Sequence, residues 1–164
     1  MIVIHDFPHG ARGLRVGWLC EEMGLPYAMK PVSFPTDSAS RSLNPFGTVP
    51  FLQHGEISMT ESIAMLFYVA QQYDMLLSNG DSRQTKVLQF TLFGEATLAS
   101  PMSPLLAERF GAPNDQKRNW SAVGIESRLK SNIACLSDQL GDREFLVGVS
   151  LTLADISVVT ALRI

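Results

Sequence analysis

The sequence is poor in cysteine and has neither an excess of positive charge nor a long hydrophobic run. Its 164 residues include two cysteines, Cys20 and Cys135, too few for a disulfide framework and without a Cys-x-x-Cys pair. The 13 Lys and Arg against 16 Asp and Glu give a net charge of −3, which argues against a nucleic-acid-binding protein. No apolar stretch reaches the roughly 20 residues that span a bilayer, and the first residues do not resemble a signal peptide. We therefore expect a cytoplasmic protein without membrane or nucleic-acid partners.

What the sequence does contain is a globular composition, with 46% apolar and 18% charged residues, that can bury a core. Residues 2–7 alternate as a strand does, residues 14–23 carry apolar side chains at helical spacing, and residues 27–34 alternate again. Gly24 and Pro26 give the stop expected at the end of this helix. The order strand, helix, strand predicts a βαβ unit with parallel strands.

A hairpin and a second helix are predicted to follow. Residues 49–53 and 56–59 flank His54-Gly55, which is typical of a two-residue turn with glycine in second place. Thr60 is a natural N-cap, and the residues after it place apolar side chains on one helical face. Together with the preceding unit, residues 1–77 are predicted to form one βαβ-ββα domain.

The strand signals disappear after residue 82, which predicts an all-α domain over residues 83–164 and a boundary within residues 77–81. A long helix should begin near residue 83. We expect it to bend near Pro101 and Pro104, because an interior proline removes a backbone hydrogen bond.

Two further helices are predicted in this domain. One covers residues 114–140, and the other begins at Thr152, where Thr152 and Asp155 have the spacing of a capping box. The sequence stops at Ile164, within the apolar pattern of this last helix and without a stop signal.

The most informative segment is residues 44–64. Pro50 cannot donate to a sheet ladder, so it must lie at the beginning or edge of its strand, where a proline is often cis. The backbone of Val49 is then available to pair with an extended, peptide-like ligand. Glu61 and Ser62 lie in the first turn of a helix, where free N–H groups favour a carboxylate and Glu61 offers a partner for an ammonium group. These features predict recognition of an amino-acid headgroup.

On these residues the sequence resembles the glutathione transferase superfamily. The resemblance implies a thioredoxin-like first domain in which Val49 and a cis Pro50 bind the cysteinyl backbone of glutathione and Glu61 with Ser62 binds its γ-glutamyl end. The matching segments, which extend over nearly the whole chain, are residues 14–16, 20–27, 145–148 and 151–156. Two alternatives stay open: Pro50 is a fold feature of thioredoxin-like domains, and Glu61 with Ser62 suits a helix start.

The residue that would activate the glutathione thiol is not obvious. The family usually has a Tyr at the end of the first strand, or a Ser or Cys in the next loop, whereas this chain has Phe7 and none of the three in residues 8–13. Arg12, the backbone N–H groups from Ala11 to Gly13, and His9 remain, since a cation and a helix N-terminus both stabilise a thiolate. The alternatives are that Arg12 is a solvated loop arginine and that His9 is merely exposed.

Two further positions bear on glutathione and on assembly. Arg41 is the only long cation between Pro31 and Phe51 that could receive the glycine carboxylate, and Thr48 occupies a slot where many relatives have Lys or Gln. Phe46 aligns with an aromatic residue that dimeric members insert into their partner, so the resemblance implies a homodimer. Alternatively, Phe46 packs under its own turn. No set of His and Cys has the spacing of a metal site.

The resemblance therefore implies a glutathione transferase that conjugates or reduces small hydrophobic electrophiles, with glutathione as co-substrate and a role in detoxification. Its second-substrate pocket is expected between the first helix and the bent long helix, lined by Phe7, Phe93, Leu105 and Phe110. The alternative is a non-catalytic module for binding or assembly. A thioredoxin-like oxidoreductase is disfavoured because Cys-x-x-Cys is absent. The resemblance also implies that the helical domain extends beyond Ile164, so we expect a C-terminally incomplete chain.

Overall fold

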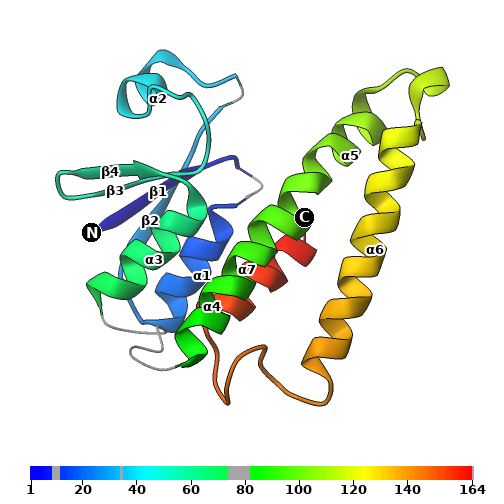
Figure 1. Cartoon of the computed structure of the whole chain (residues 1–164). Helices are drawn as coiled ribbons and strands as arrows, with labels where there is room; N and C mark the ends of the chain where they lie inside the picture. Colours follow the sequence, from blue (N-terminus) through cyan, green and yellow to red (C-terminus); the bar gives the residue numbers. More distant parts are fainter. Residues whose placement is uncertain (9–11, 34, 74–81, 164) are drawn as a thin grey trace. The chain divides into compact units, whose positions relative to one another are not determined.

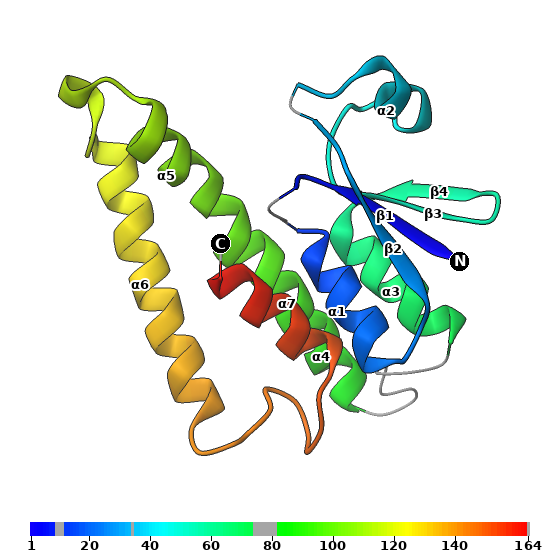
Figure 2. The same cartoon turned by 180° about the vertical axis from the view of Figure 1, so that it is seen from behind.

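The computed structural model describes residues 1–8, 12–33, 35–73 and 82–163 (Figures 1 and 2). The chain divides into two compact units, Met1–Asn79 and Gly80–Ile164. Within the described part of the chain, no helix has both the length and the hydropathy needed to cross a bilayer.

The first unit is a mixed four-stranded sheet with the strand order β2-β1-β3-β4. Strand β1 runs parallel to β2 and antiparallel to β3, and β3 pairs antiparallel with β4. The strands are β1 (Ile2–Asp6), β2 (Tyr27–Pro31), β3 (Phe51–His54) and β4 (Ile57–Thr60), and the helices are α1 (Leu14–Glu22), α2 (Ser38–Leu43) and α3 (Ser62–Gln72). The predicted βαβ-ββα order of a thioredoxin-like domain is confirmed.

Helices α1 and α3 pack side by side against the sheet, and α2 lies on its other side (Figures 1 and 2). The core between them is apolar, with fully buried side chains from β1, β3, α1 and α3: Ile2, Ile4, Val16, Leu19, Phe51, Leu52, Met65 and Leu66. Burying one such side chain stabilises a fold by about 1.5–3 kcal/mol. Helix α1 ends at Glu22, and the chain turns away at Gly24, whose φ of 62° suits glycine. The Leu25 N–H donates to the Cys20 carbonyl.

Two local predictions in this unit are wrong by one residue. His54 pairs with Ile57, so the hairpin turn is Gly55-Glu56 rather than His54-Gly55, with glycine first and at a φ of 62°. A positive φ at the first turn residue is what a type II′ turn requires. Thr60 is the last residue of β4 rather than an N-cap, because it pairs with Phe51 across the hairpin, and Glu61 occupies the N-cap position of α3.

The second unit is built from helices (Figure 1). They are α4 (Ser82–Leu92), the π-helical segment η1 (Phe93–Ala99), α5 (Ser100–Gly111), the 3-10 turn η2 (Asn114–Gln116), α6 (Trp120–Leu140) and α7 (Leu153–Leu162). A bend was predicted near Pro101 and Pro104; the structure has a π-helical segment, η1, just before them, and Pro104 lies inside α5. The helix predicted from residue 114 begins instead at Trp120, since the Asn119 side chain caps it by accepting from the Ala122 N–H.

Helix α7 packs closely against α4 and η1. A Cβ added to Gly94 of η1 would lie 2.5 Å from Ser157 Oγ and 2.8 Å from its backbone carbon, so only glycine permits this approach. Ser157 Oγ donates to the Thr91 carbonyl across the same contact. The predicted capping box of Thr152 and Asp155 is confirmed at the start of α7.

Candidate functional site

The register of the β3–β4 hairpin brings together the two segments singled out in the sequence. Phe51 pairs with Thr60 at the end of the ladder, and Pro50 and Glu61 are the residues that directly adjoin this pair in the sequence. The Val49–Pro50 peptide bond is cis, as predicted, with Val49 half-buried and Pro50 buried. One edge of the first unit therefore presents Val49, Pro50, Glu61 and Ser62 as neighbours.

The N-terminus of α3 has an unusual backbone and an unexpected neighbour. Glu61 is exposed and has a φ of 66°, a region that residues with a Cβ rarely adopt, and its side chain makes no capping hydrogen bond. Ser62 is buried, and its Oγ accepts a hydrogen bond of 3.3 Å from Nη1 of Arg15, which is fully buried on α1. A buried guanidinium behind a helix N-terminus adds positive potential where the helix dipole already favours an anion.

The sequence interpretation missed Arg15. The signal was present, because Arg15 stands four residues before Leu19 on the face of α1 that also carries Val16 and Cys20. A charged residue at a core position needs a polar partner when it is buried. The structure supplies Ser62 as one such partner.

The other two predicted ligand residues, Arg41 and Thr48, lie in α2 and in the loop between α2 and Pro50. The buried Asn44 donates from Nδ2 to the Thr48 carbonyl at 2.7 Å and accepts from the Phe46 N–H at 3.2 Å. The Arg41 guanidinium packs against Gly47, where an added Cβ would lie 2.9 Å from Nη1. The Arg41 side chain, which comes from the last turn of α2, thus lies against the loop that carries Thr48. Phe46 extends from this loop with 79% of its surface exposed.

At the end of β1, hydrogen bonds to Asp6 engage one of the groups that were predicted to activate the thiol. Asp6, which is buried, accepts from the Phe7 N–H through Oδ1 and from the Gly13 N–H through Oδ2, at 2.9 and 2.8 Å. Gly13 was one of the backbone donors offered to a thiolate, so this donor is already engaged. Arg12 is half-buried in the turn before α1. The other two candidates, Ala11 and His9, lie outside the described residues.

Histidine and cysteine side chains near the sheet are structural. His5 Nε2 is 2.9 Å from Gln53 Oε1, and the His5 ring stacks on Phe51 at 4.1 Å between centroids. Burial is the main cause that lowers the pKa of His5. Burial likewise raises the pKa of the Cys20 thiol to about 11, so this thiol is inert at neutral pH. Among the described residues, no group of His, Cys, Asp and Glu side chains could hold a metal ion.

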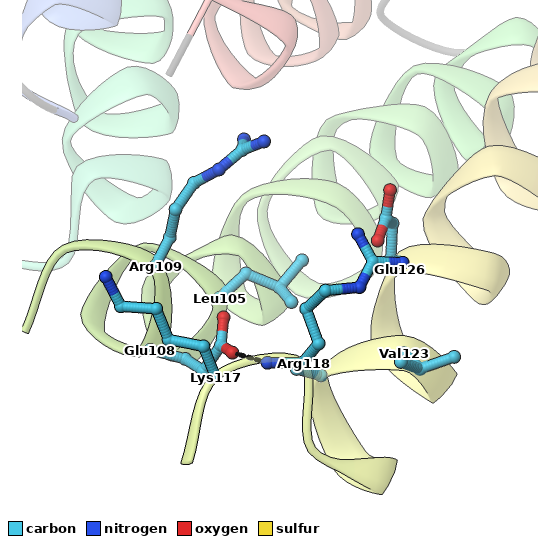
Figure 3. A pocket seen from close by; sticks show the side chains of 8 residues that line it. Leu105, Glu108, Arg109, Lys117, Arg118, Val123 and Glu126 are labelled. Atoms are coloured by element: carbon cyan, nitrogen blue, oxygen red, sulfur yellow. Dashed lines mark hydrogen bonds between the residues drawn. The ribbon is translucent and has the colours of Figure 1, made fainter. Parts of the chain in front are cut away.

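Two of the residues expected to line a second-substrate pocket border cavities, each within a single unit. Phe7 lines a cavity of about 500 Å³ in the first unit, together with Leu14, Met29 and Lys30. Leu105 lines a cavity of about 430 Å³ in the second unit (Figure 3). Phe93 is half-buried and Phe110 is 79% exposed. The shared pocket between helices remains an expectation.

Comparison with known proteins gives a consistent result. A family model described as "Glutathione S-transferase, N-terminal domain" matches residues 11–72. The chain is 30% identical over 151 residues to "Probable glutathione S-transferase GSTF2" of Oryza sativa, a match that covers 84% of this chain and 68% of that protein. It is also 32% identical over 132 residues to "Elongation factor 1-gamma" of Schizosaccharomyces pombe, of which it spans only 31%.

Solved structures share the fold. The glutathione transferase URE2P8 from Phanerochaete chrysosporium, solved with oxidized glutathione, superposes with a TM-score of 0.87 at 25% identity, over 99% of this chain and 77% of that one. A glutathione transferase from Burkholderia graminis, with two glutathione molecules bound per subunit, gives a TM-score of 0.87 at 22% identity, over 99% and 71% of the two chains.

Proposed function

Because the chain belongs to the glutathione S-transferase family, we propose that it binds glutathione along the Val49–Pro50 and Glu61–Ser62 edge and uses it to conjugate or reduce small electrophiles. The observation that supports this most is the register of the hairpin, in which Phe51 pairs with Thr60. That pairing puts a backbone segment suited to a peptide and a helix N-terminus suited to a carboxylate side by side.

The binding mode follows from the polarity of this edge. The main chain of Val49 pairs with the cysteinyl backbone of glutathione as an added strand would. The γ-glutamyl carboxylate lies at the N-terminus of α3, where Ser62 donates to it and Arg15 supplies positive charge from behind. Glu61, exposed beside it, pairs with the γ-glutamyl ammonium group.

The remaining charge of glutathione is its glycine carboxylate. In this proposal Arg41 receives it, because its guanidinium lies against Gly47 on the loop that carries Thr48. Thr48 is uncharged, and its carbonyl and hydroxyl oxygens already accept from the Asn44 amide, so it contributes its position rather than a charge.

The chemical step requires a thiolate. The free thiol has a pKa of about 8.5, and the half-buried Arg12 at the start of α1 favours its ionised form. The thiol proton leaves to solvent, the sulfur attacks the electrophilic carbon, and a C–S bond forms as the leaving group departs with its electron pair. With chlorodinitrobenzene the leaving group is chloride.

Retention on immobilised glutathione followed by a chlorodinitrobenzene assay tests this proposal. We expect retention and turnover. Arg12→Gln should lower kcat and shift the pH profile of kcat upward, because the thiolate loses its cation. The matched variant Arg41→Gln should raise KM for glutathione and leave kcat nearly unchanged. Failure of the wild-type chain to bind immobilised glutathione would refute the proposal.

A second candidate is a non-catalytic glutathione-binding module. It is favoured by the buried Asp6 carboxylate, which occupies the Gly13 N–H and places a negative charge at the start of α1. Such a charge opposes thiolate formation. Retention on glutathione without turnover of several electrophiles would select this candidate over the first.

We also propose a cytoplasmic homodimer with a role in detoxification, in which Phe46 inserts into the partner. Its support is the 79% exposure of this aromatic side chain on a loop whose backbone is fixed by Asn44. Phe46→Ser should shift the sedimentation coefficient to that of a monomer. An unchanged coefficient would exclude Phe46 as the dimer contact.

A further inference from the structure

Arg15 and Ser62 form a buried polar pair in the first unit. Arg15 lies in the first turn of α1 and is fully buried, and Ser62 is the first residue of α3, with 4% of its surface exposed. Helices α1 and α3 pack side by side (Figure 1), and Nη1 of Arg15 lies 3.3 Å from Ser62 Oγ across their contact. The pair therefore links the first turns of two helices.

The direction of this hydrogen bond follows from the two functional groups. A guanidinium group has five N–H donors and no acceptor, so Arg15 donates and the Ser62 oxygen accepts. The hydroxyl proton of Ser62 must then point away from Arg15. A buried hydroxyl in this state needs a second partner, an acceptor for its own proton.

Three buried hydroxyls within the helices of the second unit donate to a backbone carbonyl. Thr91 and Thr160 donate to the carbonyl four residues earlier, at 2.6 and 2.7 Å, and Ser157 donates to the Thr91 carbonyl. Ser62 cannot bond back in this way, because α3 begins with it and Ser58, four residues earlier, belongs to β4. Within the parts of the first unit that the structure describes, the Ser62 hydroxyl donates to no protein acceptor.

The start of α3 also lacks the side-chain cap that three other helices of the chain have. Asp37, Asn119 and Thr152 accept hydrogen bonds from backbone N–H groups at the starts of α2, α6 and α7. Glu61, at the same position before α3, makes no capping hydrogen bond, and the first N–H with a partner inside the helix is that of Met65. The N–H groups before Met65 are therefore left for an anionic ligand.

We propose that Arg15 is a positioning residue that makes this site selective for an α-carboxylate, the group at the γ-glutamyl end of glutathione. By donating to Ser62 Oγ, Arg15 directs the Ser62 proton to the carboxylate, which also accepts from the first-turn N–H groups of α3. A thiol with hydrogen in place of this carboxylate leaves the buried donor unpaired. The inference rests on the proposed glutathione site and adds which group that site selects and which residue sets the selection.

Calorimetric titration with three thiols tests the inference. They are glutathione, its 4-aminobutyryl analogue, which lacks the α-carboxylate, and its glutaryl analogue, which lacks the ammonium group. The wild type should bind the 4-aminobutyryl analogue at least about tenfold more weakly than glutathione. Arg15→Met should bind glutathione and the glutaryl analogue about tenfold more weakly than the wild type does, and the 4-aminobutyryl analogue within about threefold of it.

The control variant is Lys30→Met. It also removes one positive charge from the first unit, at an exposed position on β2, and should leave all three affinities within about twofold. Equal weakening of glutathione and the 4-aminobutyryl analogue in Arg15→Met would mean that Arg15 supports only the fold, and would overturn the inference while the glutathione site stands. A wild type that binds no glutathione would refute the proposed function and the inference with it.

Ser62→Ala gives an independent result, because it keeps Arg15 and removes the hydroxyl through which Arg15 acts. The preference for glutathione over the 4-aminobutyryl analogue should fall to within about threefold. An unchanged preference would contradict the inference even if Arg15→Met does not fold. In the double variant Arg15→Met/Ser62→Ala, the loss of glutathione affinity should be smaller than the product of the two single losses, whereas a full product would show that Arg15 acts independently of Ser62.

Discussion

Glu61 and Arg118 form a natural comparison between the two units. Each is a charged residue just before a long helix, and they are the described non-glycine residues with positive φ, at 66° and 54°. Glu61 precedes α3 inside the segment matched by the family model, and Arg118 precedes α6 outside it. The two charges are opposite, and their surroundings differ: Glu61 lies at the edge proposed to bind glutathione, whereas the Arg118 backbone N–H donates to Glu108.

The side chains around Glu61 and Arg118 differ more than the backbone conformations of these two residues do. Behind Glu61 lies a buried polar pair, Ser62 with Arg15, in the core of the first unit. Around Arg118 the neighbouring charged side chains lie at the surface, and Glu108 accepts a hydrogen bond from the Arg118 backbone N–H. A buried pair holds its geometry in the absence of ligand, whereas exposed long side chains lose rotamer freedom when a ligand binds. The segment around Glu61 is therefore the better preorganised of the two for binding a ligand.

The largest effect is expected from Ser62→Ala. It removes the hydroxyl between Arg15 and the α3 N-terminus, which should weaken glutathione binding by roughly tenfold to a hundredfold, the range for a hydrogen bond to a charged group. Ser58→Ala on the exposed face of β4 is the matched control and should bind like the wild type. If a calorimetric titration gives the same dissociation constant for both variants, Ser62 has no part in binding.

Stability measurements on glycine variants test whether the positive φ that Glu61 and Arg118 share is strained. Glu61→Gly and Arg118→Gly should keep or raise the free energy of unfolding, by up to about 1 kcal/mol, because glycine accepts a positive φ. Lys117→Gly is the control, since Lys117 has a φ of −70° and should lose about 0.5–1 kcal/mol. Urea unfolding followed by circular dichroism gives these values. If Glu61→Gly or Arg118→Gly lost as much free energy of unfolding as Lys117→Gly, the positive φ at these residues would not be a strained conformation.

Lowering the pH should reduce the stability of the first unit and leave that of the second unit unchanged. All three histidines lie before residue 80, and burial lowers the pKa of His5 below its ordinary value of 6.5. The unfolded chain then binds a proton more tightly than the folded one, so the stability contribution is present above pH 6.5 and is lost as the pH falls toward the folded-state pKa. Urea unfolding at pH 7.5 and 5.5 should show this loss in the wild type and a smaller one in His5→Gln. If His5→Gln showed the same pH dependence as the wild type, His5 would not be the cause of the loss of stability.

The smallest effect concerns the two thiols, one in each unit. Cys20 is fully buried with a pKa raised to about 11, and Cys135 is exposed on α6. A disulfide reagent at pH 7.5 should therefore label one thiol rapidly, and Cys135→Ser should abolish that labelling. Rapid labelling of both thiols would mean that the first unit opens readily.

Much of this comparison could be predicted from the sequence, and the rest depended on tertiary context. The segment that contains Val49, Pro50, Glu61 and Ser62 was identifiable because turn and helix-start residues have local causes. Arg15 was not, because its partner lies 47 residues away and only the packing of α1 on α3 joins them. The end of β4 was misplaced by one residue, since Thr60 suits a strand and an N-cap equally well and the pairing with Phe51 decides between them.

The backbone conformation before α6 could not be predicted from the sequence either. Lys117 and Arg118 were predicted to lie inside a helix, where their side chains would project in different directions. The structure instead gives a 3-10 turn and an extended segment before Trp120, and the positive φ at Arg118 brings both side chains to one cavity with Arg109. A left-handed residue other than glycine leaves little trace in the residue types around it.

The most direct test of the central claim is a calorimetric titration of glutathione into Glu61→Gln, with Glu56→Gln as the matched variant. Both carboxylates are exposed on the hairpin segment, but Glu56 lies at its turn and Glu61 at the edge with Pro50. The account predicts that Glu61→Gln weakens glutathione binding by about tenfold or more while Glu56→Gln binds like the wild type. Equal dissociation constants for the two variants would contradict the assignment of this edge as the glutathione site.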